Sequence, residues 1–120
     1  MMPAPRILVV SGKQWPRALL RAQLGEEGYD AIGAGTLARA LRYPPEDAER
    51  GPVRVIVVDS GAAAATPAAL ERARQRYPDV AFVLVHRAGA VPAGPWAATL
   101  QRPVTIGDIV ATVRRLVPVA

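Results

Sequence analysis

The sequence lacks several features that would place it in a specialised class of proteins. It contains no cysteine, which excludes disulfide bonds and thiolate metal sites. Aromatic residues make up only 5% of the chain, too few for the stacking platforms on which single-stranded nucleic acids bind. No apolar run approaches the roughly 18–20 residues that a membrane-spanning helix needs. What remains is a globular protein, for which 51% hydrophobic residues supply an ample core.

The length and the amino terminus indicate one cytoplasmic domain. A chain of 120 residues suffices for a single hydrophobic core, and we expect residues 1–120 to form one domain. The segment Met1–Arg6 runs directly into an apolar stretch and lacks the apolar core and cleavage site of a signal peptide. We therefore expect no association with a membrane.

The net charge of +5 raises the question of nucleic acid binding. Apart from Lys13, the basic residues are arginines scattered along segments that we expect to be helical. This distribution favours solvated helix faces over a nucleic acid surface. A nucleic acid is therefore not the expected partner of this domain alone, although a basic nucleic-acid-binding regulatory domain stays open as an alternative.

Short apolar runs alternate with helical spacing, which is typical of βαβ units around a buried parallel sheet. We expect helices to begin near Gln14, Thr36, Thr66 and Thr105. The expected strands are Arg6–Val10, Tyr29–Ala34, Val53–Val58, Val80–Val85 and Ala98–Gln101. The turn Gly33–Thr36 lacks the third glycine of a dinucleotide fingerprint, so we interpret it as an ordinary turn.

The segment Arg87–Pro95 is unsuited to a helix, since it contains two prolines and two glycines. We therefore expect the fourth helix of the pattern to be shortened or missing. Phe82, Leu84 and Leu100 on the neighbouring strands would then have less cover than usual. Trp96, at the end of this segment, is either a core plug or an exposed anchor for a partner.

Three local matches make the chain similar to the receiver domain of bacterial two-component response regulators. They are Ile7–Val10, Val55–Asp59 and Arg102–Thr105, and the resemblance covers essentially the whole chain. It implies a flavodoxin-like α/β fold, a doubly wound five-stranded parallel sheet in the order 2-1-3-4-5. It also implies that Asp59 stands where the family has its phosphoacceptor.

Other positions depart from the family pattern. The acidic pair that holds Mg²⁺ in the family is replaced by Ser11 and Gly12, and one carboxylate supplies too little charge for that ion. His86 stands where a small hydroxyl residue contacts the phosphoryl oxygens. Arg102 replaces the lysine before Pro103, keeping the charge on a longer, planar donor group. We expect no bound metal, no cofactor and no enzymatic activity.

These departures predict a pseudo-receiver that acts without phosphorylation as a protein–protein interaction or dimerisation module in bacterial signalling. For Asp59 three roles stay open: an inert residue bonded to nearby amides, an ion pair with Arg102, or a working phosphoacceptor in a phosphorelay. His86 is expected to be a partly buried spacer, with a pH-sensing or ligand role as the alternative. A protein partner or a second copy would contact the surface that contains Trp96, Leu100, Val104 and Ile106.

Overall fold

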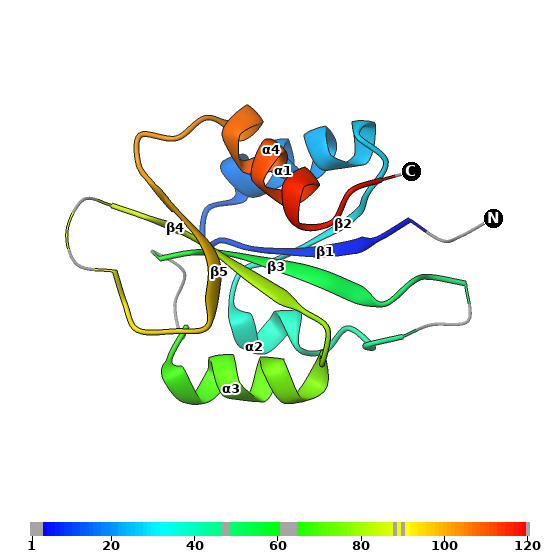
Figure 1. Cartoon of the computed structure of the whole chain (residues 1–120), viewed down its shortest axis with the longest axis horizontal. Helices are drawn as coiled ribbons and strands as arrows, with labels where there is room; N and C mark the ends of the chain where they lie inside the picture. Colours follow the sequence, from blue (N-terminus) through cyan, green and yellow to red (C-terminus); the bar gives the residue numbers. More distant parts are fainter. Residues whose placement is uncertain (1–3, 47–48, 61–64, 88, 90, 120) are drawn as a thin grey trace.

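Five parallel strands form one sheet in the order β2-β1-β3-β4-β5, which confirms the predicted topology (Figure 1). The computed structural model describes residues 4–46, 49–60, 65–87, 89 and 91–119. In chain order the elements are β1 Arg6–Val10, α1 Gln14–Glu26, β2 Asp30–Ala34, α2 Leu37–Ala40, β3 Val53–Asp59, α3 Pro67–Arg76, β4 Ala81–His86, β5 Trp96–Gln101 and α4 Ile106–Leu116. None of the helices described is long and apolar enough to cross a membrane.

Each face of the sheet carries its own apolar cluster. Helices α1 and α4 cover one face, and α2 and α3 cover the other (Figure 1). The central strand β3 contributes to both clusters, because successive side chains of a strand point to opposite faces. Ile56 and Val58 pack beneath α2 and α3, whereas Val55 and Val57 pack beneath α1 and α4. Burial on both faces explains why this strand is apolar from Val55 to Val58.

Three of the helices begin after a threonine that caps them. The hydroxyls of Thr36, Thr66 and Thr105 each accept a hydrogen bond from the backbone N–H three residues further on. At α4 the Asp108 carboxylate returns a bond to the Thr105 N–H and completes the capping box. The Thr105 cap defines where α4 begins, shortly after Arg102 in the chain.

Strands β4 and β5 pair in parallel, yet the described residues between them, 87, 89 and 91–95, contain no helix. The Trp96 indole instead packs edge-on against Phe82, with the ring centroids 6.3 Å apart. Phe82 and Leu84 are each 1% exposed, so the expectation that they have less cover than usual is wrong. Leu100 is partly buried against the cluster under α1 and α4.

A buried arginine, Arg6, lies at the amino-terminal end of β1. The side chain of Arg6 is 1% exposed, and its Nη1 donates a hydrogen bond to the Pro44 carbonyl oxygen at 2.7 Å. Its Nε lies 4.0 Å from the Asp30 carboxylate. Within the described part of the chain, Nε and Nη2 have no hydrogen-bond acceptor. Among the described ion pairs, the one with Asp30 offsets this buried charge.

Candidate functional site

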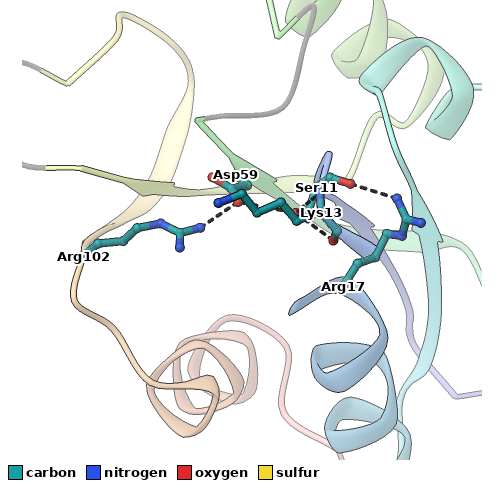
Figure 2. A network of polar contacts seen from close by, with 5 residues as sticks. All are labelled: Ser11, Lys13, Arg17, Asp59 and Arg102. Atoms are coloured by element: carbon teal, nitrogen blue, oxygen red, sulfur yellow. Dashed lines mark hydrogen bonds and ion pairs between the residues drawn. The ribbon is translucent and has the colours of Figure 1, made fainter. Parts of the chain in front are cut away.

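The carboxyl ends of the central strands bring the predicted site residues together at one edge of the sheet. Asp59 is the last residue of β3, Ser11 directly follows β1, and His86 is the last residue of β4. Backbone bonds tie these ends together, since the N–H of Arg102 donates to the His86 carbonyl at 2.7 Å. Figure 2 shows Ser11 and Arg102 on opposite sides of Asp59.

Arg102 forms an ion pair with Asp59. Its Nη2 lies 2.6 Å from Oδ2 of Asp59, a short charge-assisted hydrogen bond. The Asp59 side chain is 17% exposed and that of Arg102 is 40% exposed. The pair, which was one of the three roles open for Asp59, is thus present in the structure, and its cationic half lies in water. Pro103 follows through a cis peptide bond.

Ser11 touches the same carboxylate oxygen. Its Oγ lies 3.4 Å from Oδ2 of Asp59, and the same Oγ accepts a bond from the Lys13 backbone N–H at 3.3 Å. Both distances are long for hydrogen bonds of this type, so each contact is weak. The Ser11 carbonyl oxygen accepts a bond at 2.9 Å from Nη1 of Arg17 (Figure 2). The hydroxyl therefore fills part of the space beside Asp59 without adding charge.

Two further basic residues, Lys13 and Arg87, belong to the site, and neither was predicted as a site residue from the sequence. A cavity of about 240 Å³ beside Asp59 is lined by Gly12, Lys13, Arg87 and Arg102 together with Asp59 itself. The Lys13 side chain extends alongside Asp59 (Figure 2). The signal in the sequence was the position of the only lysine, two residues beyond Ser11. The site thus combines one carboxylate with three basic side chains.

The side chains that line this cavity do not fit Mg²⁺, the ion that the resemblance to receiver domains implies. Mg²⁺ requires several hard oxygen ligands in octahedral array. Of the described residues that line the cavity, Asp59 is the single carboxylate, and Arg102 already contacts its Oδ2. Lys13 and Arg87 would repel a divalent cation placed in the same cavity. The described residues also contain no cluster of three or more His, Asp or Glu side chains arranged for a metal.

His86 is buried at the end of β4, with 6% of its surface exposed. Its Nδ1 lies 2.7 Å from the Arg87 carbonyl oxygen. Because a carbonyl oxygen can only accept, this contact is a hydrogen bond in the tautomer that has its proton on Nδ1. The imidazole thus lies beside the backbone carbonyl of the residue that follows β4, and it is buried, where the sequence predicted partial burial.

The four residues of the predicted interface do not share one face. Leu100, Val104 and Ile106 lie partly buried against the cluster beneath α1 and α4. Trp96 packs against the cluster on the other face of the sheet, and its Nε1 donates to the Pro92 carbonyl oxygen at 2.8 Å. The structure thus groups three of the four residues and separates Trp96 from them.

Solved receiver domains share this architecture. The response-regulator receiver domain from Clostridium thermocellum superposes with a TM-score of 0.76 at 17% identity, covering 94% of both chains. A CheY-like receiver domain from Methanospirillum hungatei gives a TM-score of 0.75 at 18% identity, covering 93% of this chain and 92% of that one. The chain has the receiver fold.

About half of the chain is also similar in sequence to part of a known regulator. The transcriptional regulatory protein AruR from Pseudomonas aeruginosa is 43% identical over 60 residues, which are 49% of this chain. The match spans 25% of the length of AruR. No family model matches the chain. The resemblance inferred from Ile7–Val10, Val55–Asp59 and Arg102–Thr105 is confirmed at the level of the fold.

Proposed function

We propose that this receiver fold is a pseudo-receiver: a domain in two-component signalling or regulation that binds a protein partner or a second copy without being phosphorylated. The proposal assigns it no enzymatic activity and no cofactor. One observation carries it, namely the Asp59 carboxylate held by Arg102 at 2.6 Å within a basic cavity. This arrangement supports a site whose carboxylate is already paired with a cation in the absence of any phosphoryl group.

The pair bears on phosphorylation for two reasons. A phosphoryl group can form a bond only to a carboxylate oxygen that it can reach, and Arg102 lies on one of the two oxygens of Asp59. Phosphoryl transfer also relies on a metal to position and neutralise the donor. The side chains around Asp59 do not suit Mg²⁺. Among the described residues that line the cavity, Lys13, Arg87 and Arg102 are then the groups that offset the charge of the phosphodonor.

Incubation with acetyl phosphate and Mg²⁺ tests this proposal. We expect intact-mass spectrometry to show no phosphoryl adduct on the 120-residue chain. The Arg102→Lys and Ser11→Asp/Gly12→Asp variants restore the residues of the family at these positions, with His86 unchanged, and serve as matched gain-of-function controls. A metal-dependent adduct on the unmodified chain that disappears in Asp59→Asn would refute the proposal and favour the phosphorelay alternative.

The contact surface that we propose comprises Leu100 on β5, Val104 in the following connection and Ile106 at the start of α4. These side chains are apolar and only partly buried. Ile106→Glu introduces a charge there, and Ala22→Glu adds the same charge on the exposed face of α1. We expect Ile106→Glu to weaken self-association in sedimentation experiments, with or without acetyl phosphate, and Ala22→Glu to leave it unchanged. Equal behaviour of the two variants would place the surface elsewhere.

A further inference from the structure

A separate cavity of about 480 Å³ lies at the carboxyl end of β2. It is lined by residues of α1, of the end of β2 and of α2 with its following turn, namely Arg17, Gly33, Ala34, Gly35, Arg39, Arg42 and Tyr43. It shares no described lining residue with the 240 Å³ cavity beside Asp59, although Arg17 also lines a smaller cavity that Asp59 adjoins. Its volume is within the range of small-molecule sites, roughly 300–1,000 Å³.

The lining of this cavity is strongly basic. Three of its residues, Arg17, Arg39 and Arg42, are arginines, and none of the described lining residues is acidic. Arg39 and Arg42 are exposed, and within the described chain their guanidinium groups make no hydrogen bond or ion pair. Like charges three residues apart on a helical turn repel each other. An anion between them would relieve this repulsion.

The third arginine is held in place by the protein. Nη1 of Arg17 donates to the Ser11 carbonyl oxygen at 2.9 Å, and the arginine stem lies over Gly33. A Cβ at Gly33 would lie 3.0 Å from Cγ and Cδ of Arg17 and 2.9 Å from Cδ of Arg21. Gly33 has no positive φ, so the glycine provides room and not conformational freedom. That room lets the Arg17 stem lie flat on the end of β2.

We propose that this cavity binds a small phosphate ester, whose phosphate is held by the guanidinium groups of Arg17, Arg39 and Arg42. A phosphate carries up to two charges and offers several acceptor oxygens, so it matches three guanidinium groups better than a carboxylate does. The cavity is larger than a free phosphate ion requires, and Tyr43 contributes an apolar wall for the organic part of the ester. This inference does not depend on the pseudo-receiver proposal.

Titration calorimetry with ADP as the probe tests the site on the full chain. Arg39→Ala/Arg42→Ala removes two of the three proposed ligands. Arg54→Ala/Arg72→Ala removes the same charge from exposed positions on β3 and α3 and is the matched control. Circular dichroism checks that both variants are folded. We expect one saturable ADP site that the first variant weakens by about tenfold or more, because charge-assisted hydrogen bonds are lost, and that the control leaves within about twofold.

Three results would overturn the inference. The first is no saturable ADP binding up to about 10 mM, which corresponds to negligible affinity. The second is an equal loss in both double variants, which would show that only net charge attracts the anion. The third is binding of duplex DNA or inorganic phosphate through Arg39 and Arg42 without any binding of ADP. That result would assign the arginines to a different ligand.

Discussion

Replacing Asp59 by alanine removes the carboxylate that Arg102 contacts, and the exposure of the two side chains decides how much stability is lost. Arg102 is 40% exposed, so water can solvate its guanidinium once the partner is gone. An exposed ion pair contributes about 0.2–1 kcal/mol, whereas breaking a buried pair costs about 3–5 kcal/mol. We therefore expect Asp59→Ala to lower the free energy of unfolding by about 1 kcal/mol or less.

The coupling between the two residues follows from a double-mutant cycle of Asp59→Ala, Arg102→Ala and their combination. Urea unfolding followed by circular dichroism gives the free energy of unfolding of each variant. We expect a coupling energy of about 0.5–1 kcal/mol that shrinks in about 1 M salt. Arg102→Ala should cost less than Asp59→Ala, since Lys13 and Arg87 line the same cavity and still attract the remaining carboxylate.

Two outcomes would refute this reasoning. A coupling energy above about 2 kcal/mol would mean that the pair is shielded from water in solution. A coupling energy of zero, with the two single losses simply adding, would mean that the ion pair does not persist. The second outcome would also remove the observation that carries the proposed function.

Three further perturbations test other contacts. Asp30→Asn removes the carboxylate 4.0 Å from Nε of the buried Arg6, and in urea unfolding we expect it to cost about 1–3 kcal/mol more than the exposed control Asp79→Asn. Thr105→Ala removes the cap of α4, for which we expect a loss of about 1 kcal/mol in the same assay. Burial raises the pKa of Tyr29 above its ordinary value of 10.0. The unfolded chain therefore loses this proton at lower pH than the folded chain does, so stability should fall as pH rises above about 10, and fall less in Tyr29→Phe.

Each of these expectations can fail in a distinct way. Equal losses in Asp30→Asn and Asp79→Asn would show that other groups offset the charge of Arg6. A Thr105→Ala variant as stable as the parent would mean that water replaces the cap at no cost. Parallel stability curves for the parent and Tyr29→Phe above pH 10 would show that the phenol titrates alike in both states.

Local sequence signals predicted most of the fold because they coincide with the physics of each element. The β-branched run from Val53 identified β3, and the threonine caps set the starts of α2, α3 and α4. The glycines and prolines of segment 87–95 likewise indicated that no regular helix follows β4. The strand order came from the resemblance, since spacing alone does not specify which strands are neighbours.

What the sequence did not predict depends on tertiary placement. The pairing of β4 with β5 shifts register between Phe82 and Val83, and this shift separates Trp96 from Leu100 across the sheet. A strictly alternating strand would have put both on one face. The sequence did not predict the burial of Arg6 either, because an arginine at the start of a strand is ordinarily exposed to solvent. The basic cavity at the carboxyl end of β2 combines residues from α1, β2 and the α2 region, so no local sequence motif predicts it.

The outer edge of β5 has a consequence for how the protein behaves at high concentration. In the described sheet β5 is a terminal strand, and its sequence Trp96–Gln101 contains no charged residue and no proline. Natural proteins usually protect such edges with charge, proline or a bulge, because the free N–H and C=O groups can pair with another chain. Here Pro95 and Arg102 flank the strand, and the register shift opposite Phe82 and Val83 interrupts it near its start, so the regular stretch of this edge is Ala98–Gln101. We therefore expect this stretch to pair with a strand from another molecule at high concentration, and we expect a lysine in place of the exposed Thr99 to oppose that pairing.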